Sequence, residues 1–197
     1  MARSDLSRQS GRASSLSIPL LLAACTVLTS ACTSSAGTDD KKTEAAPTPT
    51  VSSSTQDPTE KAKADATKTY AMYWGELEKL YADPSGKSAN VAQYAASTAL
   101  DSSQADAKNT HAKGLVHTGS VTVAGTTVTA IDLDRQVPSA TLSSCLDISK
   151  WQVVDATTKK PAVFPSTRLT KYVIVTTVER WPEGWRVVRD EPKGQPC

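Results

Sequence analysis

The chain has 197 residues, of which 39% are hydrophobic, 22 are basic and 20 are acidic. This length is enough for one domain of ordinary size with a single core, and nothing in the sequence indicates a second domain. A formal net charge of +2 without a cluster of Lys or Arg argues against nucleic acid as a partner and against a phosphate-binding face.

An apolar segment at residues 16–32 follows a short N-terminal run that carries Arg3, Arg8 and Arg12. A basic run, an apolar segment and then small residues form the layout of an export signal. A membrane-spanning helix needs roughly 20 apolar residues, and Ser, Thr and Pro interrupt this segment. We therefore expect residues 1–31 to be a signal peptide that is removed on export.

Two cysteines near the end of the apolar segment follow pairs of small residues. The sequences LAAC, ending at Cys25, and TSAC, ending at Cys32, resemble the lipobox of bacterial lipoproteins. The resemblance implies that the thiol is acylated and that the cysteine becomes the new N-terminus. Cys25 has the better local match, whereas Cys32 gives a longer apolar segment and leaves an even pair, Cys145 and Cys197. We expect the lipid on Cys32, with Cys25 as the alternative and release without a lipid as a third reading.

Residues 32–56 are expected to be a disordered tether. They contain Pro, Thr, Ser and mixed charges and almost nothing that a core could bury. The 24 residues from 33 to 56 could reach about 80 Å when fully extended. The predicted location is therefore extracytoplasmic, with the domain at residues 57–197 lipid-anchored to the outer face of the cytoplasmic membrane.

A long amphipathic helix is predicted between Asp57-Pro58 and the turn at Asp83-Pro84. Asp57 is an N-cap residue, and a proline is tolerated in the first turn of a helix. Bulky side chains then recur at spacings of three and four, which defines one apolar face: Tyr70, Tyr73, Trp74, Leu77, Leu80 and Tyr81. Such a stripe favours core packing over ligand stacking, because a single long helix must bury it against something. Two shorter, alanine-rich helices are expected at residues 90–100 and 101–113.

After Leu115 the apolar residues alternate with polar ones, which is typical of half-buried strands. A turn at Ala124-Gly125 predicts a hairpin, and Pro182-Glu183-Gly184 predicts another. The strand at 169–181 is apolar on both faces and is expected to be central and covered on each side. The expected strands, about six in all, are 119–123, 126–135, 140–147, 151–155, 169–181 and 184–190. Helices followed by antiparallel strands predict an α+β fold, with the helices gathered on one face of a curved sheet.

Several of these segments carry a second resemblance. The Tyr- and Trp-bearing first helix, the sequence CLD running into WQVVD, the strand WRVV and the terminal Cys197 look like small secreted actinobacterial lipoproteins with a cone-shaped, nuclear-transport-factor-like or cystatin-like domain. The resemblance implies a sheet curved around the first helix and a pocket at the open end of the cone. The candidate pocket residues are Tyr73, Trp74, Tyr172 and Trp185. No fixed activity is implied, because this fold hosts both enzymes and binding modules.

Cys145 and Cys197 are expected to form a disulfide that ties the C-terminus to a strand, because two remaining cysteines outside the cytosol are normally joined. A redox pair would need the close Cys-x-x-Cys spacing, which is absent.

Catalytic signals are few, and we predict no catalytic residue, no cofactor and no metal site. No nucleophile elbow, zinc-protease motif, P-loop or dinucleotide fingerprint is present. His117 with Tyr94 or Asp147 is a weak candidate for an acid and base pair, and Asp132 with Asp134 is a weak candidate for carboxylate chemistry or calcium binding.

We therefore expect a non-catalytic binding or interaction module, whose partner is an envelope protein or a small apolar ligand. The alternative is a pocket enzyme of the isomerase or dehydratase type, which needs a buried ionisable group with a shifted pKa. An Asp or His buried beside a Tyr would favour the enzyme, and a small or apolar pocket would favour the binding module.

Overall fold

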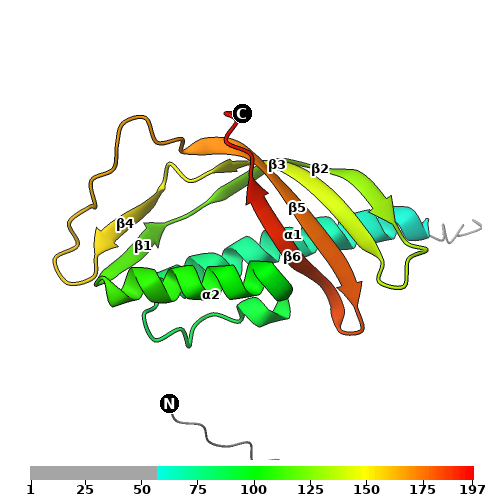
Figure 1. The fold of residues 1–197 in the computed structure, drawn as a ribbon, viewed down its shortest axis with the longest axis horizontal. Coiled ribbons are helices and arrows are strands. Elements are labelled where there is room, and N and C mark those ends of the chain that lie inside the picture. Colours follow the sequence, from blue (N-terminus) through cyan, green and yellow to red (C-terminus); the bar gives the residue numbers. More distant parts are fainter. Residues whose placement is uncertain (1–56) are drawn as a thin grey trace, which may run out of the picture. The chain divides into compact units, whose positions relative to one another are not determined.

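The computed structural model describes residues 57–197; the predicted signal peptide and tether, with Cys25 and Cys32, lie outside the described residues. The elements are, in order, α1 (Pro58–Ala82), η1 (Val91–Gln93), α2 (Ser97–Ala112), β1 (Leu115–Gly119), β2 (Thr122–Asp132), β3 (Ser139–Asp147), β4 (Trp151–Asp155), β5 (Lys171–Trp181) and β6 (Gly184–Pro192). Helices packed against antiparallel strands confirm the predicted α+β class (Figure 1). Neither α-helix of this part combines the length and apolar character needed to span a bilayer.

Helix α1 begins and ends where the capping signals predict. The Asp57 side chain accepts the Thr59 N–H at 2.8 Å, and Pro58 occupies the first turn. Beyond the C-terminus, the Asp83 carboxylate accepts the N–H groups of Ser85 and Ser88. The buried face of the helix consists of Ala62, Ala66, Tyr70, Tyr73, Trp74, Glu76 and Leu77. The aromatic stripe is therefore core-forming, as expected.

The two predicted short helices are wrong, because one continuous helix, α2, crosses the boundary between them. The chain before it is held extended by β6. The Ala96 N–H donates to the Val187 carbonyl at 2.9 Å, and the Val187 N–H donates to the Tyr94 carbonyl at 2.8 Å. Because these residues pair with a strand, the helix cannot begin before Ser97.

The six strands form two antiparallel sheets rather than the one expected curved sheet. Strands β2, β3, β5 and β6 form the larger sheet in that order, and β1 pairs with β4 in a separate ribbon. The predicted hairpin at Ala124-Gly125 is wrong. Strand β2 runs through it, with a register shift between Ala124 and Thr127 and a φ of +60° at Gly125. The glycine therefore serves a β-bulge instead of a turn.

Strand β5 lies between β3 and β6, as expected of a central strand. Its Ile174, Thr176 and Val178 are buried in the core, whereas the alternate residues on the other face are only half-buried. The prediction that both faces are covered is therefore wrong. The core lies on one side of the larger sheet, between it and α1.

The predicted disulfide is confirmed. Cys145 of β3 is joined to Cys197, with their Cα atoms 5.8 Å apart. The C-terminal tail also follows β5, since the Val173 N–H donates to the Gln195 carbonyl at 2.8 Å. The bond therefore fixes the end of the chain against the larger sheet.

Candidate functional site

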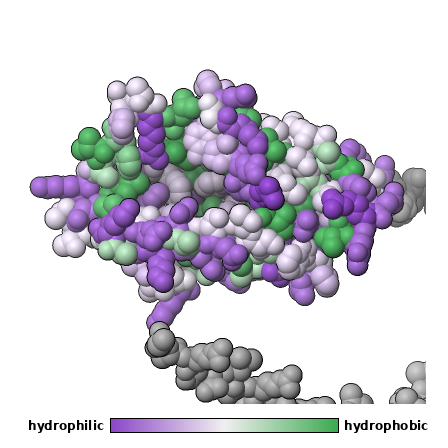
Figure 2. Space-filling view, in the orientation of Figure 1, coloured by the Kyte–Doolittle hydropathy of each residue, from purple (hydrophilic) through white to green (hydrophobic). Residues whose placement is uncertain are grey.

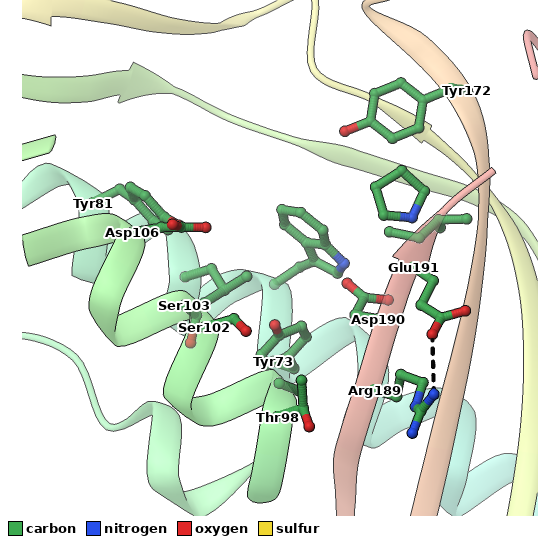
Figure 3. Close-up of a pocket in the computed structure, with 15 residues that line it drawn as sticks. Tyr73, Tyr81, Thr98, Ser102, Ser103, Asp106, Tyr172, Arg189, Asp190 and Glu191 are labelled. Carbon is green, nitrogen blue, oxygen red and sulfur yellow. Dashed lines mark hydrogen bonds and ion pairs between the residues drawn. The ribbon is translucent and has the colours of Figure 1, made fainter. Parts of the chain in front are cut away.

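A pocket of about 410 Å³ lies between α1, α2 and the adjoining parts of β5 and β6 (Figure 3). Four aromatic side chains line it together with three carboxylates and three hydroxyl groups from α2. In chain order these are Tyr73, Trp74, Tyr81, Thr98, Ser102, Ser103, Asp106, Tyr172, Asp190 and Glu191. We refer to it as the Asp190 pocket.

Three of the four predicted pocket residues line this pocket. Tyr73 and Trp74 reach it from the buried face of α1, and Tyr172 reaches it from β5. Trp185 does not line it and is instead buried in the hydrophobic core near the start of β6. The α1 stripe therefore packs the core and also forms one wall of the pocket.

Asp190 is a polar pocket group that no sequence pattern predicted. Figure 3 shows the Asp190 carboxylate pointing from β6 into the pocket, which Tyr73 of α1 also lines. Cross-strand pairing sets Asp190 opposite Thr176, and the Thr176 hydroxyl donates to its carboxylate at 2.6 Å. A carboxylate therefore lies on the core-facing side of a strand that otherwise presents apolar residues there.

A bulge in β6 explains why Asp190 faces inward. Trp185 and Val187 face the core, so simple alternation would place Arg189 inside and Asp190 outside. The register instead pairs Val187 with Val178 and Arg189 with Thr177, which leaves Val188 as an extra residue. That extra residue reverses the alternation and turns Asp190 into the pocket.

Burial raises the pKa of Asp190 to about 7, although its contacts with Thr176 and Tyr70 lower it. None of the ion pairs within residues 57–197 includes Asp190. The negative charge of this carboxylate, when ionised, is therefore not balanced by a cation of the described chain.

The other charges of the pocket lie at its rim. Glu191 pairs with Arg189 at 3.3 Å and with Lys193 at 2.8 Å, so two cations compensate it. Asp106 is exposed on α2 and makes no ion pair in the described part. Burial, with the charge of Asp106, raises the pKa of Tyr81 to about 12. Carboxylates thus outnumber cations in the lining, and the lining tyrosine stays neutral at physiological pH.

Two buried donors lie in or against the pocket wall without a hydrogen-bond partner in the described part: the Tyr70 hydroxyl and the Trp74 indole N–H. The Tyr70 side chain is fully buried, and burial together with the charge of Asp190 raises its pKa. Tyr70 does not line the pocket, and its contact with Asp190 is one of those that lower the pKa of that carboxyl.

His117 does not form the predicted acid and base pair with Tyr94 or Asp147. Its ring packs against Trp151, at 4.2 Å between centroids, and against Tyr81, at 4.8 Å. Burial, helped by the nearby charge of Arg168, lowers the pKa of His117 to about 4. The histidine is therefore a neutral member of an aromatic cluster.

The remaining candidates show no site. Asp132 accepts the backbone N–H of Asp134 at 3.2 Å in an exposed turn. Within residues 57–197 no group of three or more metal-ligating side chains is gathered. A larger hollow, of about 580 Å³, opens between the ends of the β2–β3 and β5–β6 hairpins, but none of the predicted pocket residues lines it.

Comparison with known proteins assigns no family. No protein-family model matches the chain, and no curated protein is similar enough to count as a relative. Among solved structures, the chain is similar to the intermembrane-space region of the chloroplast protein ARC6. The TM-score is 0.44 at 14% identity, over 66% of this chain and 95% of that one. A likeness of this size carries no argument about function.

Proposed function

We propose that the protein is an exported, lipid-anchored module of the cell envelope that binds a small organic cation in the Asp190 pocket. The observation that supports the ligand class is a carboxylate inside an aromatic-walled pocket that makes no ion pair in the described chain. An ammonium group would balance Asp190 and lie against the faces of the surrounding aromatic rings, which attract cations. The volume is also within the range of small-molecule sites, roughly 300–1,000 Å³.

The anchor rests on the N-terminal sequence, which lies outside the described residues. The basic run, the apolar segment and the cysteines Cys25 and Cys32 support it, and a disulfide suits an oxidising compartment. Metabolic labelling with a fatty acid in Cys25→Ala and Cys32→Ala variants tests it. We expect only Cys32→Ala to lose the label. If both variants keep the label, neither cysteine is the sole acceptor and the anchor as proposed is wrong.

The ligand class is tested by three probes that share one apolar body: 2-phenylethylamine, 2-phenylethanol and phenylacetate. Calorimetry at about pH 8, where Asp190 is ionised, should show the amine binding at least about tenfold more tightly than the alcohol. Phenylacetate should bind most weakly. If the alcohol or the acid binds as tightly as the amine, the pocket does not select cations.

The variant Asp190→Asn is the matching test of the residue. We expect it to lose the preference for the amine while keeping the affinity for the alcohol, because the amide still accepts from Thr176 and leaves the volume unchanged. The control is Asp101→Asn, an exposed position on the same helix as Asp106 that does not line the pocket. An equal loss in both variants would mean that the effect is only long-range electrostatics.

A pocket enzyme is the second candidate, and a specific observation favours it. Asp190 has a pKa of about 7 and lies beside Tyr70 and Tyr73, which is the arrangement expected of a general acid or base. Incubation with enolisable ketones in deuterated water, followed by NMR, tests for proton abstraction next to a carbonyl. Exchange that Asp190→Asn abolishes would support the enzyme, and no exchange above the buffer rate would favour the binding module.

A further inference from the structure

The loop between β4 and β5, residues 156–170, gathers most of the exposed bulky apolar side chains of the described chain. Five such residues are exposed in residues 57–197, and three of them lie in this loop: Val163 at 97%, Phe164 at 44% and Leu169 at 42%. Figure 2 shows apolar side chains beside strongly polar ones at this end of the molecule. Large apolar side chains that gather on a surface usually mark an interaction site.

The same loop is positively charged, contrary to the expectation that the chain has no cluster of Lys or Arg. Lys159, Lys160 and Arg168 lie in it, and residues 156–170 contain no acidic residue. None of the three cations takes part in an ion pair of the described part. The guanidinium of Arg168 lies 4.3 Å from the centroid of the Phe164 ring, so charge and apolar surface are interleaved.

The backbone holds these side chains outward. The first part of the loop pairs back onto β4, where the Ala162 N–H donates to the Val153 carbonyl at 2.9 Å. The far end is fixed by the Ile148 N–H, which donates to the Thr170 carbonyl at 2.8 Å. The apolar tip between these ties is therefore presented without refolding of the domain.

We propose that this loop docks on a membrane that contains anionic lipids, with Val163 and Phe164 entering the interface and the three cations contacting headgroups. Apolar residues flanked by Lys and Arg are the composition that binds such surfaces. Charge complementarity favours this partner over a neutral one. The docking rests on the proposed anchor only in that the anchor would bring the domain to the surface.

The length of the chain outside the described residues permits this contact. Figure 1 shows the loop at the end of the domain away from Pro58, where the described chain begins. The 25 residues of α1 span about 37 Å, whereas the 24 residues at 33–56 reach up to about 80 Å. The loop can therefore touch the same membrane that holds the N-terminus.

The experiment uses the full acylated chain in vesicles of phosphatidylcholine, with and without phosphatidylglycerol, and limited trypsin digestion. Trypsin cuts after Arg168 in the loop and after Lys87, an exposed residue between α1 and η1. The rate of cleavage after Arg168 divided by the rate of cleavage after Lys87 reports protection of the loop within one molecule. We expect the ratio to fall about tenfold on the anionic vesicles, with high salt reversing part of the effect.

Two variants and one control separate the contributions. Val163→Ser/Phe164→Ser should restore cleavage after Arg168 on anionic vesicles. Lys159→Gln/Lys160→Gln should lower the affinity for anionic vesicles by about fivefold for each charge removed, so that most of the protection of Arg168 is lost. Met72→Ser/Val137→Ser removes two apolar side chains that are similarly exposed elsewhere, at 41% and 40%, and should leave protection unchanged.

Equal cleavage ratios on the two kinds of vesicle, or a Val163→Ser/Phe164→Ser variant as protected as the wild type, would overturn the proposal and leave the loop to a protein partner. The mass of the N-terminal peptide in the same digest shows whether the chain is acylated. Failure of the anchor and failure of the docking are thereby distinguished. A chain that carries no lipid can still be added to the same vesicles from solution, where protection of Arg168 tests the docking alone.

Discussion

The carboxyl group of Asp190 is ionised more readily in the unfolded chain than in the folded protein. Its pKa rises from 3.8 to about 7 on folding, chiefly because of burial. Between these values the folded state keeps a proton that the unfolded state releases. The contribution of protonated Asp190 to the free energy of unfolding is therefore fully present below about pH 4. It decreases as the pH rises to about 7, and it is lost above that.

The variant Asp190→Asn should remove this pH dependence. A shift of three pKa units corresponds to at most about 4 kcal/mol, so the variant should gain up to that much over the wild type between pH 4 and pH 8. Urea unfolding at several pH values measures the difference between the two proteins. His117 has the opposite effect on the free energy of unfolding, because its lowered pKa destabilises the fold as the pH falls from about 6.5 to about 4. Both proteins contain His117, so its effect cancels in the difference between them. Parallel curves would show that Asp190 titrates normally.

At the scale of the elements, one glycine fixes how the β1–β4 ribbon closes. Gly119 has a φ of +87°, and an added Cβ would lie only 1.9 Å from the Lys150 carbonyl oxygen. We expect Gly119→Ala to destabilise the fold by at least about 2 kcal/mol, because the backbone itself must move. The matched control is Gly75→Ala in the middle of α1, where a methyl group meets nothing within 4 Å. That variant should stabilise the protein by about 0.5–1 kcal/mol. Equal effects in chemical denaturation would contradict this account.

The disulfide links two elements that are distant in the sequence. Cys145 and Cys197 are 52 residues apart, and closing a loop of that length stabilises a protein by about 4 kcal/mol in the chain-entropy model. The double variant Cys145→Ala/Cys197→Ala should lose an amount of this order in urea unfolding, with ligand binding preserved below the transition. A loss under about 1 kcal/mol would mean that the C-terminal tail is held by its hydrogen bonds to β5 alone.

For the whole molecule, patterns that depend on neighbours in the chain were predictable, and those that depend on strand register were not. Capping at Asp57 and the spacing of the aromatic residues predicted α1, and the same residues supplied Tyr73 and Trp74 to the pocket. The bulge at Val188 has no local signal, since either register satisfies the alternation of apolar residues up to that point. The sequence therefore does not assign Asp190 to the pocket, and Ala124-Gly125 predicts a turn although Gly125 serves a bulge in β2.

Three features occur together in one molecule: a predicted acylated N-terminus, a basic and apolar loop, and a pocket with a half-buried carboxylate. The pocket lies between the helices and the larger sheet, whereas the loop lies at the far end of β4. Occupation of the pocket and contact with a membrane are therefore expected to be compatible, so that a docked domain can still bind its ligand.

The most direct measurement is the titration of Asp190 by carbon NMR, in the free protein and with saturating 2-phenylethylamine. We predict a pKa of about 7 in the free protein and a clear decrease when the amine is bound, because the ammonium group stabilises the ionised carboxylate. A pKa near 4 in the free protein, or a value that the amine does not change, would contradict the central claim that the half-buried Asp190 carboxylate is arranged to receive a cation.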